Sequence, residues 1–191
     1  QHLLAAKLQT SDQGEVPTAL RELQRVVGDI RQRWPAVRIT IRGDGAYSND
    51  ALMCWCEEDG IDFVLGMPKN QRLNKRIAGL QASMLEKAKG SDGPVRCFDS
   101  FQYKTLKSWS RERRVIAEVE QLQDKANPRF VVTSLDDDAQ RLYEDIYCAR
   151  GDAENRIKEQ QMGLFADRAS SHTMRGNQLR LWFSSMAYIL M

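Results

Sequence analysis

The residues best suited to chemistry lie in one stretch late in the chain, between positions 147 and 161. They combine a carboxylate with a phenol, a guanidinium, an ammonium and an amide: Tyr147, Arg150, Glu154, Lys158 and Gln161. If the stretch is an α-helix, the spacing of three or four residues places all five on one stripe, within about 40° of Glu154. A stripe of this kind suits a phosphate-rich partner or a bound cation. The alternative is a solvated helix face with i,i+4 ion pairs, for which Glu154 and Lys158 have the right spacing.

The helix that must carry this stripe is expected to span residues 139–162. A neighbouring stripe is apolar and is expected to pack inward. It consists of Ile146, Ala149, Ala153, Ile157 and Leu164.

A second carboxylate of interest is Asp44, which has a glycine on each side. Val37, Ile39 and Ile41 alternate with polar residues, which predicts a strand that ends at Asp44. Open α/β sheets bind ligands at the carboxyl ends of their parallel strands, and glycine lets a ligand approach closely. Carboxylates on a strand end and on a helix could share Mg²⁺, which takes few protein carboxylates together with water and phosphate oxygens. Two such ions about 4 Å apart support in-line phosphoryl displacement.

The composition neither demands nor excludes a nucleic-acid partner. The chain has 191 residues and a net charge of +2, which suits one domain or part of a larger one. No apolar run approaches the roughly 20 residues of a membrane span, and no signal peptide is visible. The four cysteines show no metal-binding or CxxC spacing, so they are expected to be buried free thiols in a reducing cytoplasm. They are Cys54, Cys56, Cys97 and Cys148.

Alternating strand and helix patterns predict an α/β core in the first third of the chain. The expected order is a strand at 3–8, a helix at 18–34, a strand at 37–42, a helix at 49–59 and a strand at 61–66. Asn49 and Ser48 are the candidate caps of the second helix, which is expected to bury Leu52, Met53 and Trp55, and Gly60 suits its end. This order favours a mostly parallel sheet covered by helices.

The pattern changes after Pro68, where a small antiparallel block is expected. A polar helix at 73–89 is followed by strands at 95–106, 108–120 and 129–135, with a turn at Asn127 and Pro128. A last helix is expected from about residue 177.

Basic and aromatic residues are interleaved in this block. The cations are Lys104, Lys107, Arg111, Arg113 and Arg114, and the rings are Phe101, Tyr103 and Trp109. This mixture suits a nucleic-acid surface, where cations meet phosphates and rings stack on bases. The alternative is an ordinary antiparallel sheet with one wet, basic face.

The order of these motifs resembles a known family. Tyr147, Arg150, Glu154 and Gln161 are spaced like the tyrosine–arginine–glutamate–lysine signature of bacterial insertion-sequence transposases of the DDE type, transposase DDE domain group 1. The segment Ile41–Tyr47 is similar to the part of these enzymes that carries the second catalytic aspartate. Further similar segments lie at 61–66, 129–135, 154–159 and 177–183. The resemblance covers essentially the whole chain.

The resemblance implies an α/β fold with an RNase H-like core, a mixed sheet with flanking helices, and a β-rich insertion between the second aspartate and the glutamate helix. Asp44 would be the second catalytic, metal-binding carboxylate and Glu154 the third, with two Mg²⁺ or Mn²⁺ ions. Tyr147 and Arg150 would contact DNA near the transposon end. Gln161 stands at the signature's lysine position, and Lys158, one turn earlier, is the candidate to take over its phosphate contact.

The family's first aspartate lies on an earlier strand, and no residue of this sequence is assigned to it. The chain is therefore expected to be a fragment that is inactive alone. Residues 1–67 would form the first part of the core, 68–136 a helix and the insertion, and 137–191 the glutamate helix and the last helix.

The expected activity of the full-length enzyme is DNA cleavage at transposon ends and strand transfer into target DNA. The expected partners are DNA and further copies of the chain, without a membrane, in the bacterial cytoplasm at the nucleoid. Two alternatives stay open: a non-catalytic DNA-binding remnant that regulates an intact transposase, and an RNase H-like nuclease without strand transfer.

Overall fold

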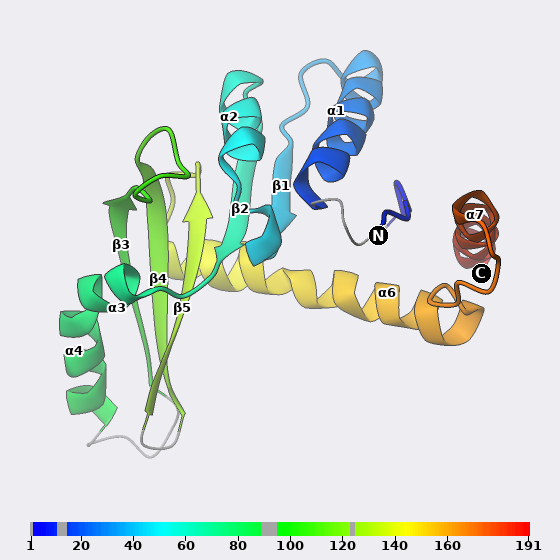
Figure 1. Cartoon of the computed structure of the whole chain (residues 1–191). Helices are drawn as coiled ribbons and strands as arrows, with labels where there is room; N and C mark the ends of the chain where they lie inside the picture. The colour runs from blue at the N-terminus through cyan, green and yellow to red at the C-terminus, as the bar shows by residue number, and fades with distance from the viewer. Residues whose placement is uncertain (1, 11–14, 89–94, 123–124) are drawn as a thin grey trace. The chain divides into compact units, whose positions relative to one another are not determined.

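The computed structural model describes residues 2–10, 15–88, 95–122 and 125–191 (Figure 1). These residues form two compact units. One unit contains the residues up to Val37 and those from Arg150 onward, and the other runs from Arg38 to Ala149. Asp44 therefore belongs to the second unit and Glu154 to the first.

A five-stranded mixed sheet forms the centre of the unit from Arg38 to Ala149 (Figure 1). Its strands are β1 (Thr40–Gly43), β2 (Asp62–Met67), β3 (Arg96–Tyr103), β4 (Arg113–Leu122) and β5 (Lys125–Thr133), in the spatial order β1-β2-β5-β4-β3. β1 and β2 are parallel, whereas the other three pairings are antiparallel. The prediction of a mostly parallel sheet is wrong, because a helical crossover joins β1 to β2 alone.

The three later strands continue the sheet of β1 and β2. β5 pairs with β2 from Thr133 opposite Val64 to Phe130 opposite Met67, and β4 and β3 follow on its far side. The predicted β-rich block therefore exists in the expected order, and it has no separate sheet of its own. Its status as an insertion into an RNase H-like core stays a prediction.

Pro128 lies inside β5, so the predicted turn at Asn127 and Pro128 is wrong. Pro128 pairs with Val119 of β4. β2 reaches β5 only from Phe130 to Thr133, so β5 has an open side at Pro128. Proline is tolerated where the strand edge is open, because no N–H is needed there.

The helix after β1 forms as its capping residues predict. α2 (Asp50–Glu58) is capped by Asn49, whose side chain accepts a hydrogen bond from the Ala51 N–H, and Gly60 after its end has a φ of 60°. α2 buries Leu52, Met53 and Cys56. Trp55, which was expected inside, is half-buried, because its indole N–H donates to Asp59 at 2.8 Å and needs a polar partner.

The single helix predicted over residues 73–89 is two helices. α3 (Gln71–Arg76) and α4 (Ala78–Ala88) are separated at Ile77, whose N–H donates to Leu73. Leu73, Ile77 and Met84 are all buried. The helix therefore breaks at a residue whose own side chain is buried, as are Leu73 of α3 and Met84 of α4.

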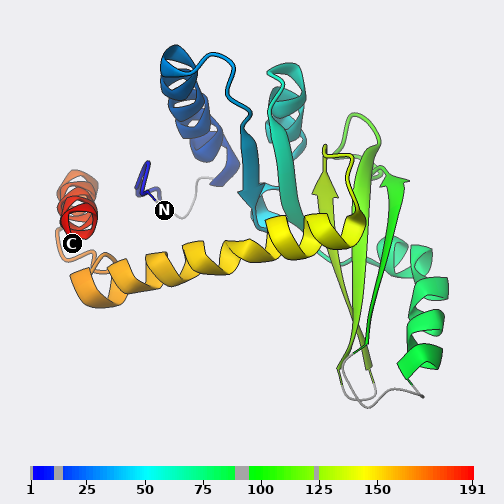
Figure 2. The ribbon, with the colours of Figure 1, turned by 180° about the vertical axis from the view of Figure 1, so that it is seen from behind.

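Different helices cover the two faces of the sheet (Figure 1 and Figure 2). α2 lies on one face, and the π-helical turn η2 (Leu142–Tyr147) lies on the other, after α5 (Ala139–Arg141). Side chains alternate along β2, so Phe63 and Leu65 point away from the η2 face that Val64 occupies. The core on the η2 face consists of Val64, Ile116, Val131, Leu142 and Tyr143.

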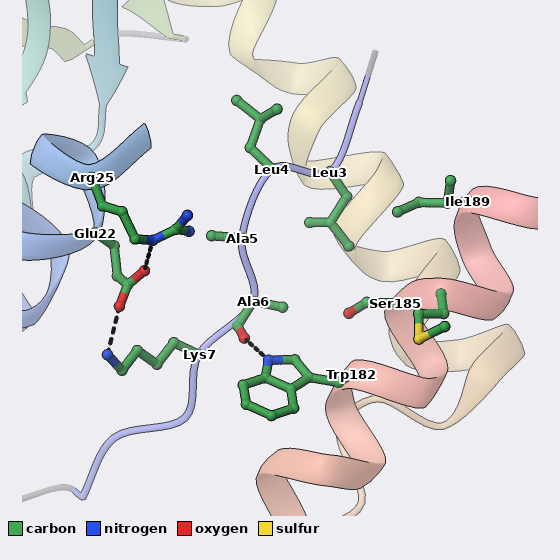
Figure 3. Close-up of a pocket in the computed structure, with 11 residues that line it drawn as sticks. Leu3, Leu4, Ala5, Ala6, Lys7, Glu22, Arg25, Trp182, Ser185 and Ile189 are labelled. Carbon is green, nitrogen blue, oxygen red and sulfur yellow. Dashed lines mark hydrogen bonds and ion pairs between the residues drawn. The ribbon is translucent and has the colours of Figure 1, made fainter. Parts of the chain in front are cut away.

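In its described residues, the other unit contains three helices and an extended segment. The helices are α1 (Glu15–Arg33), α6 (Gly151–Leu164) and α7 (Met174–Leu190). Residues 2–10 form no strand, so the prediction at 3–8 is wrong. Side chains of α7 satisfy this backbone instead: Gln178 donates to the Ala6 carbonyl at 3.0 Å and accepts from Leu8 N–H at 2.8 Å, and the Trp182 indole N–H also donates to Ala6 (Figure 3).

The cysteines are free, as expected, but two of them are not buried. Cys56 and Cys97 are buried, Cys54 is half-buried and Cys148 is exposed. Among the described residues, no helix combines the length and the apolar character needed to cross a membrane.

A buried arginine ties α2 to the sheet. Arg113 at the start of β4 is 4% exposed, and its guanidinium donates to Asp50 at 2.7 Å and to Glu57 at 2.5 and 3.0 Å. A further N–H points to the Cys54 sulfur at 3.3 Å. Burial disfavours the charge, but the two carboxylates outweigh it and raise the pKa of Arg113. α2, which follows the Asp44 turn, is thereby held against β4.

We predict that Arg113→Ala lowers the free energy of unfolding by about 3 kcal/mol, because two partly buried carboxylates lose their partner. Urea unfolding measures this. Arg111→Ala is the matched control, since Arg111 pairs with the same Glu57 at 3.5 Å but is exposed. Its removal should change the free energy by less than about 1 kcal/mol. Equal effects of the two substitutions would contradict the role given to Arg113.

Candidate active site

Asp44 lies directly after β1, as predicted, at the carboxyl end of the parallel pair β1 and β2. It caps the 3-10 turn η1 (Gly45–Tyr47), and its Oδ1 accepts a hydrogen bond from Ala46 N–H at 3.0 Å. The side chain is exposed. The turn therefore presents a carboxylate to solvent in an orientation fixed by the backbone.

Gly66 of β2 brings Tyr147 against this turn. A Cβ at Gly66 would lie 2.5 Å from the Tyr147 hydroxyl oxygen, 3.1 Å from Gly45 N and 3.3 Å from Asp44 C. These three atoms fill the space that a side chain at position 66 would need. Two residues that sequence reasoning singled out from distant segments, Asp44 and Tyr147, meet over one glycine.

Arg42 is a positioning residue that sequence reasoning missed. It faces the η2 side of the sheet next to Val64, and its Nη1 donates to the Ile146 carbonyl at 2.7 Å. This bond joins the strand before Asp44 to the residue before Tyr147. The available signal was an arginine at an alternating position of a short strand, where a solvated side chain was the simpler interpretation.

The segment that carries Tyr147 is not a uniform α-helix. α5 is followed by the π-helical η2, then by a 3-10 turn, η3 (Cys148–Arg150), and then by α6. The predicted helix over 139–162 is confirmed as a continuous helical segment, but it is not uniformly α-helical. The argument from 100° per residue therefore applies only within α6, since the rotation per residue differs between these helix types. The Tyr143 and Tyr147 rings pack 5.6 Å apart, and Tyr143 packs equally close to Phe98.

Within α6 the spacing argument holds. Glu154, Lys158 and Gln161 follow one face, and all three are exposed. Ile157, which was expected to pack inward, is 53% exposed. Gln160 is buried instead, because its amide donates to Ser184 and Ser185 of α7 at 3.4 and 2.9 Å.

Asp44 and Glu154 fit a hard divalent cation by donor type, since Mg²⁺ takes oxygen ligands and retains several waters. Both carboxylates are exposed. In the part of the chain that the structure describes, no three His, Cys, Asp or Glu residues gather as a ready metal site. Neither carboxylate is therefore part of a complete metal site among the described residues, and a metal bound by either one would need further ligands.

The cations expected to bind DNA differ in their surroundings. Arg113 is buried between carboxylates, and Arg114 donates to the Leu135 carbonyl at 3.0 Å. Arg111 is exposed but paired with Glu57, while Lys104 and Lys107 are exposed on the connection from β3 to β4. The Arg150 side chain lies outside the described residues.

A buried acid under η2 was also missed. Glu118 of β4 is fully buried, and among the described residues neither of its carboxylate oxygens has a hydrogen-bond partner. Burial raises its pKa, and the neighbouring Glu120 adds to the effect. The cations of Arg129 and Arg96, the latter 3.7 Å from Glu118 Oε1, and the nearby Tyr143 hydroxyl oppose it. Burial also raises the pKa of Tyr143 above it to about 12, so this phenol stays protonated.

The mixed five-stranded sheet with helices on both faces is an α/β architecture consistent with an RNase H-like DDE domain. The family model described as transposase DDE domain group 1 matches residues 1–191, so the chain belongs to that family. This membership supports a transposase role, and DDE transposase domains generally use divalent metals. The comparison with curated proteins finds no match.

We predict that Gly66→Ala destabilises the protein by about 1–3 kcal/mol, the usual cost of overpacking. The added methyl group would press on the Tyr147 hydroxyl and on the Asp44 turn. The double variant Gly66→Ala/Tyr147→Phe removes the closest contact and should recover part of the stability in a thermal melt. Gly79→Ala is the control: its Cβ meets no atom within 4 Å, so it should be neutral or stabilising. A melting temperature unchanged by Gly66→Ala would refute the close approach.

We predict that Glu118→Gln raises the melting temperature at neutral pH. Below the ordinary carboxyl pKa of 4.5, Glu118 is protonated in both folded and unfolded chains and has no effect. As the pH rises, the unfolded chain ionises first, so stability falls until the raised folded pKa is passed. The gain from Glu118→Gln should therefore vanish below pH 4.5. Glu112→Gln, at an exposed site, should show no such profile; a destabilising Glu118→Gln at neutral pH would contradict the assignment.

Proposed function

We propose that the chain is the catalytic-core part of a DDE transposase, which cuts DNA at transposon ends and joins the freed 3′-OH to target DNA. Asp44 and Glu154 are the proposed metal-binding carboxylates. The observation that carries the proposal is the contact over Gly66, where the signature residue Tyr147 lies against the turn of Asp44. A merely solvated helix face gives no reason for these two motifs to meet.

The proposed chemistry divides between a bound metal and the side chains. When bound, Mg²⁺ or Mn²⁺, as one or two ions, activates the attacking oxygen and stabilises the leaving one. Asp44 offers a carboxylate whose orientation is already fixed by Ala46 N–H, which lowers the reorganisation needed during reaction. Tyr147, packed beside this turn, keeps its proposed role as a DNA contact near the transposon end. A further carboxylate, the family's first aspartate, is required and is not assigned in this sequence.

The remaining signature residues are proposed as phosphate contacts. Lys158 and Gln161 share the exposed face of α6 with Glu154, and Arg150 precedes that helix. Lys104 and Lys107 keep their proposed role, whereas the guanidinium of Arg113 is occupied by Asp50, Glu57 and Cys54. The enzyme is proposed to act on DNA as a homo-oligomer in the bacterial cytoplasm.

We predict that Asp44→Asn or Glu154→Gln, in the complete transposase, lowers cleavage of the element's own ends by about a thousandfold, the scale of losing a group that stabilises charge in the transition state. DNA binding in a gel-shift assay should be retained. Asp44→Cys should recover activity in Mn²⁺ more than in Mg²⁺, because a thiolate is a softer ligand.

Glu58→Gln is the control, since Glu58 is an exposed carboxylate at the end of α2. Cleavage at the normal rate by Asp44→Asn would overturn the metal assignment. The wild-type protein separates the alternatives: cleavage without joining indicates a nuclease, and binding without cleavage indicates a non-catalytic remnant.

A further inference from the structure

Seven exposed cations in the sheet-bearing unit have no ion pair among the described residues. One of them, Lys87 of α4, stands apart from the others in the sequence. The other six are Lys69, Arg72, Lys75, Arg76, Lys104 and Lys107. Several other arginines of the unit do have carboxylate partners within 4.0 Å: Arg96, Arg111, Arg113, Arg114, Arg129 and Arg141. The unpaired positive charge is thus concentrated in two segments, 69–76 and 104–107, which contain no acidic residue.

Contacts join the two segments into one surface. Arg72 of α3 donates to the Lys104 carbonyl at 3.1 Å and lies over the Tyr103 ring, 5.2 Å from its centre. Arg76 lies over the Phe101 ring at 5.4 Å. Figure 1 shows α3 beside the upper part of β3, which carries both rings. We call residues 69–76 and 104–107 the α3 surface.

The aromatic rings of the α3 surface are not available for stacking on bases. Phe101 and Tyr103 are buried, and guanidinium groups lie above them. A guanidinium stacked on a ring still has N–H groups in its plane that can donate to phosphate oxygens. The surface therefore suits the backbone of a nucleic acid and gives no sign of base reading.

The α3 surface begins at the candidate active site. Pro68, the residue before Lys69, lies against the Asp44 turn: its Cδ is 3.5 Å from the place of a Cβ on Gly45. If one phosphate of a duplex lies at Asp44, the neighbouring phosphates can contact the cations of the α3 surface within the same unit.

We propose that the α3 surface binds the sugar–phosphate backbone of the transposon-end duplex beside the phosphate that is cut. The proposal rests on the proposed function, and it moves the main backbone contact from Arg111, Arg113 and Arg114 to α3. The end duplex is the chosen partner because the surface is continuous with the turn at which the end is processed.

The test uses Lys75→Gln/Lys107→Gln in the complete transposase, since both side chains are exposed and lie on the two different segments of the α3 surface. Binding is measured by fluorescence anisotropy with a labelled duplex that carries the element's terminal repeat, over a series of salt concentrations. The slope of log K against log salt should fall by about 1.8, or about 0.9 for each phosphate that the variant no longer neutralises. Affinity for an unrelated duplex should fall by the same factor, as binding to the backbone requires.

Lys87→Gln/Arg141→Gln is the matched control, because it removes the same charge from exposed positions of the same unit outside the α3 surface. It should leave the slope unchanged. An equal slope for the α3 double variant and the wild type would overturn the proposal. Normal end cleavage with a defect confined to joining would also overturn it, because the surface would then serve target DNA.

Failure of the proposed function gives a different result. In that case the wild-type protein does not cleave the ends at all, or cleaves them equally well as Asp44→Asn. If instead Asp44→Asn binds but does not cleave, while the α3 double variant binds like the wild type, the α3 surface alone is refuted.

Discussion

The close approach over Gly66 is the contact on which the candidate active site depends. β2 is hydrogen-bonded to β1 on one side and to β5 on the other, so its backbone cannot shift to make room for a side chain at Gly66. Because Gly66 has no side chain, the Tyr147 hydroxyl and the Asp44 turn can both pack against it. The bond from Arg42 to Ile146 adds a second link between the same two segments. A small residue in the sheet thus places a signature tyrosine beside a candidate metal ligand.

Two buried ionisable residues of β4, Arg113 and Glu118, lie on opposite faces of the sheet and differ in whether they have partners. Arg113 is fully engaged by carboxylates of α2 and the thiol of Cys54, so its burial is compensated and it anchors that helix. Glu118 lies under η2 without a hydrogen bond among the described residues, although Arg96 Nε is 3.7 Å from its Oε1, and burial raises its pKa. The destabilised group lies on the face that carries Tyr147, where the chain departs from regular α-helix.

The distribution of cations follows from pairing rather than from number. The net charge of +2 says little about DNA. Ion pairs engage the arginines of β4 and its neighbourhood, and most of the positive charge left on exposed side chains lies in residues 69–76 and 104–107. Lys69, Lys104 and Arg72 each donate to an uncharged oxygen of the protein, but without a carboxylate partner they keep their charge and their other N–H donors for phosphate. The α3 surface therefore differs from the DNA-binding surface that the basic and aromatic residues of the sequence predicted.

The sequence by itself determined those helices and strands that depend on interactions between residues close together in the chain. Asn49 and Gly60 mark the ends of α2, alternation up to Ile41 marks the strand before Asp44, and the ordered motifs identify the family. The tertiary structure alone decided the rest. It shows that Arg113 is engaged by α2, that Gly66 admits Tyr147, and that Pro128 lies within a strand, because each depends on residues far away in the chain. Periodicity and capping act between near neighbours, whereas burial, pairing and close approach depend on which distant segments pack together.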